Sequence, residues 1–483
     1  MLSFGRRLAA LAVARPAAAA VTCGERTLTR SELDISSNRW ARALFGMGVR
    51  QDDRVTIALP NSVEFYQITV ALWKIGATPL PVSSRLPRKE LNEIIQLSDT
   101  PLVIGVDPQW YPDRKVLPAD FTPDGSLSSE PLPDAIASHW KVCTSGGSTG
   151  RPKLIVDARS TVFDETLGTF LHLPNEQAVC LPGPLYHNAA FSWSLIALLR
   201  GNHVITLPKF DAQSTLKLID THDVSWVGLV PTMMNRIWRL EPSVRDGYDI
   251  STLRTVFHSG APCPAWLKEA WIGWLGPERI VEAYGGTEGQ GVTRIDGVEW
   301  LQRKGSVGRA FPGCRMKICD ESGQEVASGN RGEIFFLPDS GQGSTYRYIG
   351  AEPKAIEGGW ETLGDVGCVD ADGYLYVADR SKDLILCGGA NIYPAEVEAA
   401  IESHPAVRSS IVIGLPDDDL GQRVHAIVDA PAGLNEGALR AHLAEQIVRY
   451  KIPRSFEFVS ESLRDEAGKV RRSEFLRRRS ECK

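Results

Sequence analysis

The segment best equipped for chemistry on an anion runs from Ser145 to Lys153. It reads Ser-Gly-Gly-Ser-Thr-Gly-Arg-Pro-Lys, so three glycines and three hydroxyl residues precede a lysine. Glycines let a backbone approach a bulky anion and turn its N–H groups toward it, hydroxyls add donors, and the lysine adds positive charge. It is not a Walker loop, which ends in Gly-Lys-Ser/Thr, and a flexible linker remains the alternative for the segment taken alone. The residues predicted to hold a polyphosphate are Ser145, Gly146, Gly147, Ser148, Thr149, Gly150 and Lys153.

Four motifs farther along the chain carry groups that suit a phosphate site. In Tyr284-Gly-Gly-Thr-Glu288, a hydroxyl (Thr287) and a carboxylate (Glu288) directly follow a glycine turn. A carboxylate beside a phosphate loop can hold Mg²⁺, which prefers oxygen ligands and bridges to phosphates. The other three motifs are Gly364-Asp365, the charged run 379–383 and Gly468-Lys469. Taken alone, the four motifs also fit a turn, a strand end, a linker and a surface lysine.

Composition limits the class of protein. The chain has 483 residues, a length that implies two or more domains. Its contents of 43% hydrophobic and 23% charged residues are typical of globular proteins. A net charge of −6 argues against nucleic acid as the main partner. Nine cysteines without a CxxC pair indicate free thiols in a reducing compartment, so we expect a cytoplasmic protein, as a monomer or homodimer. Arg15 and Pro16 interrupt the first apolar run, which predicts a short surface helix rather than a signal peptide, and we expect no membrane span.

The elements that must position these groups alternate between strands and helices. Thr29-Arg-Ser-Glu32 has capping-box spacing and opens a helix that Gly46 ends. The alternation predicts an α/β fold with mixed or parallel sheets flanked by helices. Residues 107–138 are rich in Pro, Asp and Ser and predict a surface excursion, whereas glycine-separated β runs over 305–373 predict a small barrel-like layer. Beyond Asp383 a small α+β unit of about 100 residues begins.

The motifs occur together in an order that is very hard to explain by chance. Over nearly its whole length the sequence resembles the acyl-adenylate-forming superfamily, which includes acyl- and aryl-CoA ligases, firefly-luciferase-like enzymes and the adenylation domains of peptide synthetases. Tyr284 to Glu288 matches the superfamily's Tyr-Gly-x-Thr-Glu, and the glycine-rich run 388–396 falls where expected. The resemblance implies an N-terminal AMP-binding domain (1–379), a hinge (380–382) and a small mobile C-terminal lid domain (383–483).

The resemblance also implies a role for each matched residue. ATP, Mg²⁺ and coenzyme A are the implied cofactors, with Thr287 at the α-phosphate and Glu288 as the metal ligand. Lys469 is implied to bridge the substrate carboxylate and the α-phosphate, and Lys382 occupies the hinge position. One lid orientation would bring in Lys469 for adenylation, and the other would bring in the 388–394 face for thioester formation. The remaining implied positions are Ser259, Gly260, Ala261, Pro262 and Tyr284 at the adenine, Asp365 and Arg380 at the ribose, and Gly388 and Gly389 on the thioester-forming face.

His187 matches a motif near the acyl pocket and the substrate carboxylate in this superfamily. A hydrogen-bonded structural histidine is an equal alternative. Residues of the segment 226–234 are expected to line the acyl pocket, although core packing fits some of them as well. These candidates are Trp226, Gly228, Val230, Met233 and Met234.

The implied function is ATP-dependent activation of a carboxylic acid with release of pyrophosphate, followed by acyl transfer to the thiol of coenzyme A. Phe191-Ser192 stands where amino-acid-activating domains have Phe-Asp, which argues against a free amino acid. The branch of bile-acid or fatty-acyl CoA ligases is the most similar, and a bulky or aromatic acid fits as well. An adenylating amide or ester synthetase, with an amine or alcohol in place of CoA, remains the alternative. A non-catalytic sensor is disfavoured because four matched residues occur together: Glu288, Asp365, Arg380 and Lys469.

Two positions depart from the family pattern. Asp465-Glu466 precedes Lys469 where the family has Pro-(Arg/Lys)-Thr-x-x-Gly, and Gly146 stands where serine is frequent. Neither departure removes a catalytic group. The acidic pair is expected to affect how the lid docks.

Overall fold

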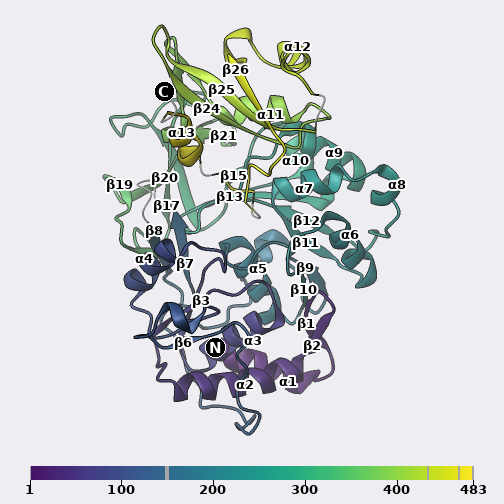
Figure 1. Ribbon diagram of the computed structural model, residues 1–483, viewed down its shortest axis with the longest axis vertical. Coiled ribbons are helices and arrows are strands. Elements are labelled where there is room, and N and C mark those ends of the chain that lie inside the picture. Colours follow the sequence, from purple (N-terminus) through teal and green to yellow (C-terminus); the bar gives the residue numbers. More distant parts are fainter. Residues whose placement is uncertain (1, 147–151, 432–433, 466–467, 471, 481–483) are drawn as a thin grey trace.

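The computed structural model describes residues 2–146, 152–431, 434–465, 468–470 and 472–480 (Figure 1). Its largest sheet has nine strands in the order β15-β14-β13-β12-β11-β9-β10-β1-β2. The strands from β13 to β1 in this order are parallel, and parallel neighbours require crossover connections, which helices supply. The strands are β1 (Ala19–Cys23), β2 (Arg26–Thr29), β9 (Ala178–Cys180), β10 (His203–Thr206), β11 (Trp226–Leu229), β12 (Thr255–His258), β13 (Ile280–Gly285), β14 (Val292–Asp296) and β15 (Arg309–Ala310).

Helices cover this sheet, and the predicted capping box is present. Thr29 accepts a hydrogen bond from the Glu32 N–H, and the Glu32 carboxylate accepts one from the Thr29 N–H. The first helix ends at Ala14, before Pro16, but it is more than a surface helix because Phe4, Leu8 and Leu11 are buried. The helices of the N-terminal unit are α1 (Phe4–Ala14), α2 (Arg30–Gly46), α3 (Val63–Lys74), α4 (Arg88–Ser98), α5 (Asn188–Leu199), α6 (Ala212–Thr221), α7 (Pro231–Trp238), α8 (Pro242–Arg245), α9 (Ala265–Leu275) and α10 (Gly297–Gln302).

Three smaller sheets complete the N-terminal unit. A parallel sheet contains β4 (Thr78–Pro81), β3 (Arg54–Ile57), β5 (Val103–Ile104) and β6 (Val116–Leu117), so the predicted excursion 107–138 contributes an edge strand. An antiparallel sheet contains β18 (Tyr346–Ile349), β8 (Pro152–Asp157) and β7 (Val142–Gly146). The predicted barrel-like layer is a half-barrel of β16 (Cys314–Cys319), β17 (Gly332–Pro338), β20 (Trp360–Val369), β19 (Lys354–Ile356) and β21 (Leu375–Arg380).

The C-terminal unit is α+β, as predicted, and lies at the top of Figure 1. Its sheet has the order β23-β22-β25-β24, with β26 paired to β25. Among the described residues, no helix is both long and apolar enough to cross a membrane. The elements are β22 (Ile385–Cys387), β23 (Ala390–Ile392), α11 (Pro394–Glu402), β24 (Ser409–Asp417), β25 (Gly421–Asp429), α12 (Glu436–Gln446), β26 (Ser455–Val459) and α13 (Arg472–Ser480).

Candidate active site

Several of the predicted site residues lie at or just beyond the carboxyl ends of β11, β12 and β13, where the C-terminal unit docks. Open α/β sheets bind their ligands at this edge. Gly468 of the C-terminal unit is buried, has φ +75°, and packs against Thr232 of α7, so that a methyl group added at Gly468 would collide with the Thr232 side chain. The docking therefore brings Lys469 to the strand ends.

Glu288 lies between a tyrosine and the lysine of the glycine-rich segment. Its buried carboxylate accepts a hydrogen bond from the Tyr348 hydroxyl (2.6 Å), and Oε1 lies 3.5 Å from Lys153 Nζ. The same ammonium lies 3.7 Å from the centroid of the Tyr348 ring. Burial and the Glu288 charge raise the pKa of Tyr348 above its usual range, so the hydroxyl keeps its proton. Thr287, which is partly exposed, directly precedes this carboxylate after β13.

The two predicted ribose residues come together through strand register. Asp365 of β20 stands opposite Arg380 of β21, and the side chain of Arg380 lies outside the described part of the chain. The Tyr284 hydroxyl donates to Asp365 Oδ2 (2.7 Å). This hydrogen bond joins the predicted adenine position to the predicted ribose position.

The base of the predicted phosphate loop is a β-hairpin. Ser145 of β7 pairs with Lys153 of β8, and Gly146 pairs with Pro152. The intervening candidates Gly147, Ser148, Thr149 and Gly150 lie outside the described residues.

His187 lies at the junction of the two units, just before α5. Its Nε2 is buried and has no hydrogen-bond partner, and Asp465 Oδ2 lies 3.9 Å away. Burial, assisted by the Lys469 charge, lowers the pKa of His187 to about 3. The imidazole is therefore neutral near pH 7, and its contact with Asp465 is not an ion pair. A buried polar atom without a protein partner can bind a ligand group or an ordered water.

Asp465 shapes the turn that carries the predicted adenylation lysine. Its Oδ1 accepts a hydrogen bond from the Lys469 N–H (2.8 Å), and its own N–H donates to the Lys469 carbonyl (3.0 Å). The side chain of Lys469 is exposed. The acidic residue that departs from the family pattern thus has a structural contact in this turn.

A pocket of about 410 Å³, part of it open to solvent, lies between α5 and the ends of β11 and β12. Gly228 and Met233, two of the residues predicted for the acyl pocket, line it, and so do His187 and Ser259. Trp226 lies directly behind Gly228, because a methyl group at Gly228 would be 3.0 Å from its ring. Apolar side chains form most of the wall: Leu181, Pro184, Ala190, Trp193, Val230 and Phe257.

The remaining candidates lie on turns. Ser259, Gly260, Ala261 and Pro262 follow β12, and Gly260 has φ +85°. Gly388 and Gly389 form the exposed turn between β22 and β23, with φ +56° and +81°. Lys382 is exposed on the short 3₁₀ turn after β21.

Two family models match most of the chain. The model of the AMP-binding enzyme matches residues 8–340, and the model of the AMP-binding enzyme C-terminal domain matches residues 396–469. The chain belongs to the AMP-binding enzyme family. Its predicted place in the acyl-adenylate-forming superfamily, acyl-CoA synthetase branch, is confirmed.

Several characterised proteins are similar to this AMP-binding enzyme over nearly their whole length. A feruloyl-CoA synthase from Amycolatopsis sp is 33% identical and covers 96% of each chain. A fatty acid–[acyl-carrier-protein] ligase from Streptomyces coeruleorubidus is 30% identical and covers 95% of this chain and 93% of the relative. The structure of o-succinylbenzoate CoA synthetase from Bacillus subtilis, in complex with its acyl-adenylate intermediate, has a TM-score of 0.80 and 25% identity over 97% of both chains.

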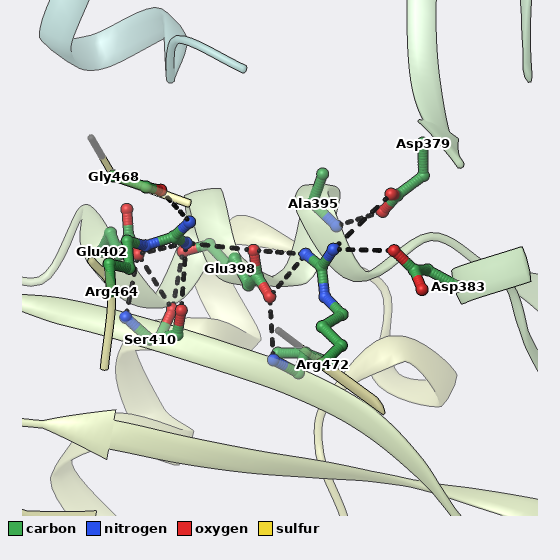
Figure 2. A network of polar contacts seen from close by, with 10 residues as sticks. Asp379, Asp383, Ala395, Glu398, Glu402, Ser410, Arg464, Gly468 and Arg472 are labelled. Carbon is green, nitrogen blue, oxygen red and sulfur yellow. Dashed lines mark hydrogen bonds and ion pairs between the residues drawn. The ribbon is translucent and has the colours of Figure 1, made fainter. Parts of the chain in front are cut away.

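In this AMP-binding enzyme, the N-terminal unit holds helix α11 of the C-terminal unit at both ends. At the N-terminus of the helix, Asp379 Oδ2 accepts a hydrogen bond from the Ala395 N–H (2.8 Å; Figure 2). At its C-terminus, Arg239 donates to the carbonyls of Glu402 (2.9 Å) and Pro405 (2.5 Å). An acid at the first turn and a base at the last turn both complement the helix dipole.

An arginine cluster extends this contact across the predicted hinge (Figure 2). Arg472 donates from Nη2 to both carboxylate oxygens of Glu398 (2.8 Å each), and its Nη1 lies 3.2 Å from Asp383 Oδ2 and 3.9 Å from Asp379 Oδ1. Arg464 lies 3.2 Å from Glu398. Asp379 and Asp383, on the two sides of segment 380–382, therefore lie next to one arginine, Arg472, which also binds the buried carboxylate of Glu398.

Sequence reasoning missed two residues next to the site. Tyr348 carries no local signal, because its contact with Glu288 depends on the pairing of β18 with β8. Lys141 does carry one, since a lysine stands in an apolar run just before the glycine-rich segment. Its buried ammonium donates to Ser192 Oγ (2.7 Å) and to Asn188, and burial lowers its pKa. It ties the hairpin of the phosphate loop to α5.

Proposed function

We propose that this enzyme activates a carboxylic acid with ATP and transfers the acyl group to the thiol of coenzyme A, as an AMP-forming acid–thiol ligase. The observation that carries the proposal is the docking of the Lys469 turn at His187, beside a pocket and on the sheet edge that holds Glu288. Two of the relatives named above, the feruloyl-CoA synthase and the o-succinylbenzoate CoA synthetase, carry coenzyme A in their names, which supports a thiol acceptor.

In the first step, a carboxylate oxygen of the acid attacks the α-phosphorus of ATP. The bond from this phosphorus to the oxygen that bridges the α- and β-phosphates breaks, and pyrophosphate leaves with the electron pair. Both reactants are anionic, so Lys469 would bridge the carboxylate and the α-phosphate, with Thr287 as a further donor. Lys153 and the glycine-rich loop would hold the departing pyrophosphate. The loss of one such contact typically costs about 10²–10³ in rate.

The surroundings of Glu288 fit a magnesium ion shared with the nucleotide. Among the described residues, no cluster of three or more His, Cys, Asp or Glu side chains could hold a metal by itself. Mg²⁺ is usually bound by one or two carboxylates together with substrate phosphates, which suits the single buried carboxylate of Glu288, held by Tyr348. When bound, Mg²⁺ neutralises the charge that develops on the phosphates.

The neutral His187 would orient the acid. Its buried Nε2 faces the junction where Lys469 enters, and it has no hydrogen-bond partner of its own. A neutral imidazole positions the carboxylate through hydrogen bonding without a second positive charge. Tyr284 and the loop 259–262 would bind the adenine, and Asp365 and Arg380 would bind the ribose.

In the second step, the thiol of coenzyme A loses its proton and the sulfur attacks the acyl carbonyl carbon. The carbon–oxygen bond to AMP then breaks, and AMP leaves. For this step the lid would turn about Lys382 and bring the Gly388-Gly389 turn to the site, in place of Lys469. The adenylate is labile in water, so a lid that closes over it has a clear advantage.

The test measures the two steps separately. ATP–pyrophosphate exchange is followed over a panel of carboxylic acids, and the best acid is then offered with CoA or with amines. Lys469→Ala should lower exchange by about 10²-fold or more and still pass a presynthesised acyl-adenylate to CoA. Lys304→Ala is the matched control, since this exposed lysine pairs with Glu269 on the surface. If exchange survives in Lys469→Ala, the role proposed for Lys469 in adenylation is wrong. If the acyl group is transferred to amines but not to CoA, the protein is an amide synthetase.

A further inference from the structure

Two stacked aromatic rings lie beside the pocket at His187: Phe257 lines the pocket, and Trp226 lies behind Gly228. Trp226 and Phe257 have ring centroids 5.7 Å apart and planes at 23°. Phe257 stands opposite Gly228 in the β11–β12 register, and Trp226 lies two residues before Gly228, so the three residues share one face of the sheet. The Trp226 ring is fixed, because it is 1% exposed and its Nε1 donates to the Leu171 carbonyl (2.9 Å).

A second aromatic side chain, that of Trp193, lines the pocket. Trp193 of α5 meets Phe257 edge-on, with centroids 6.2 Å apart and planes at 82°. Gly228 has no side chain, and the Trp226 ring lies 3.0 Å from the place where a Cβ would stand, so Trp226 backs the pocket at this position. Aromatic side chains prefer offset-stacked or edge-on partners, which gives the Phe257 and Trp193 rings that line the pocket an affinity for a flat ring.

The pocket offers no charge to a polar tail. Among the described residues that line it, His187 is the only titratable side chain, and burial keeps it neutral near pH 7. A second carboxylate or an ammonium on the acid would be buried without a partner, which is costly. A dicarboxylic acid or an amino acid is therefore disfavoured.

We infer that the acid activated here is compact and carries a flat, uncharged ring, as in benzoic and cinnamic acids, with Trp226 limiting its length. The inference rests on the proposed function. The lining is apolar apart from His187 and Ser259, and Trp193 and Phe257 are its aromatic members. A long alkyl chain would enter only if the Trp226–Phe257 stack opened.

The experiment uses benzoate, cinnamate, decanoate, palmitate and phenylalanine as probes. ATP–pyrophosphate exchange gives kcat/KM for each acid without CoA, and titration calorimetry without ATP gives the affinity for cinnamate. The kcat/KM of exchange for benzoate and cinnamate should exceed that for palmitate and phenylalanine by about tenfold or more, since one methylene in an apolar pocket changes kcat/KM by about 10–200-fold.

Two variants test the side of the pocket formed by Gly228 and Trp226. Gly228→Ala should lower both exchange and binding of cinnamate by about tenfold or more, because the added methyl lies 3.0 Å from the Trp226 ring. Gly273→Ala in α9 is the control, since nothing lies within 4 Å of its added methyl. Trp226→Leu should raise the ratio of decanoate to benzoate, with melting curves to confirm that it folds.

The outcomes separate this inference from the proposed function. Preference for palmitate or phenylalanine in the unaltered enzyme would overturn the inference and leave acid activation intact. Equal cinnamate binding in Gly228→Ala and the parent would also overturn it. If cinnamate binds but neither cinnamate nor any other acid supports exchange, the proposed function is wrong instead.

Discussion

Removal of the Arg239 side chain should weaken the lid orientation that presents Lys469, without altering any group that touches substrate. The guanidinium donates to the Glu402 (2.9 Å) and Pro405 (2.5 Å) carbonyls at the end of α11. A cation at a helix C-terminus contributes about 0.3–2 kcal/mol, and a hydrogen bond from a charged group about 1.5–3 kcal/mol. Because this side chain is partly exposed, we expect a net loss of about 1–2 kcal/mol, a factor of about 5–30 in the lid equilibrium.

The assay compares the two half-reactions in Arg239→Ala. In the proposed mechanism, ATP–pyrophosphate exchange needs the orientation that presents Lys469, so its rate should fall by about 5–30-fold where that orientation becomes the minor one. Transfer of a presynthesised acyl-adenylate to CoA would use the other orientation, so its rate should stay the same or rise. Arg254→Ala, at an exposed position of the N-terminal unit, should change neither rate.

The opposite end of α11 provides an independent check. Asp379→Ala removes the cap on the Ala395 N–H and should shift the two half-reactions in the same directions. The two caps lie about 12 Å apart along the helix, so their effects on exchange should add in the double variant. Equal loss of both half-reactions would indicate general destabilisation, and unchanged exchange in both single variants would refute the idea that the ends of α11 hold the lid.

Two further substitutions test the junction. Gly468→Ala should lower the exchange rate about tenfold or more, because φ at Gly468 is +75° and the added methyl would collide with Thr232. The second substitution Thr232→Gly should restore part of that rate. An exchange rate in Gly468→Ala equal to that of the parent would contradict the observed docking. His187 titrates at about 6.5 in the unfolded chain and about 3 in the native state, so the unfolded chain binds more protons and stability falls as pH drops from 6.5 toward 3. Between pH 7 and 5 the parent should lose about 2 kcal/mol more unfolding free energy than His187→Gln in urea titrations, and parallel losses would show that His187 is not buried neutral.

The extent to which the sequence predicts this site depends on whether a contact is local. The capping box at Thr29 and Glu32 is confirmed because both of its hydrogen bonds lie within one turn. The family motifs pointed to Glu288 and Asp365 as site residues, since each belongs to a recognisable turn or strand, and their roles stay predictions. The Tyr348–Glu288 hydrogen bond spans 60 residues and depends on sheet register, which no local pattern encodes. The cap of α11 by Arg239 likewise exists only once the two units have docked.

The acidic departure before Lys469 illustrates the same limit. From the sequence, Asp465 places a negative charge where the family has none, next to a site for two anions. In the structure, one of its oxygens accepts the Lys469 N–H (2.8 Å), and its carbonyl accepts the Gly468 N–H (2.9 Å). A carboxylate that accepts a backbone N–H from the same turn shapes a tight turn, much as Asp does in an Asx-turn. The other oxygen faces a neutral imidazole at 3.9 Å. Asp465 therefore shapes the turn, and Gly468 fixes where the turn docks. The acidic residue at position 465 thus leaves Lys469 at the strand ends, where an acid and ATP would meet.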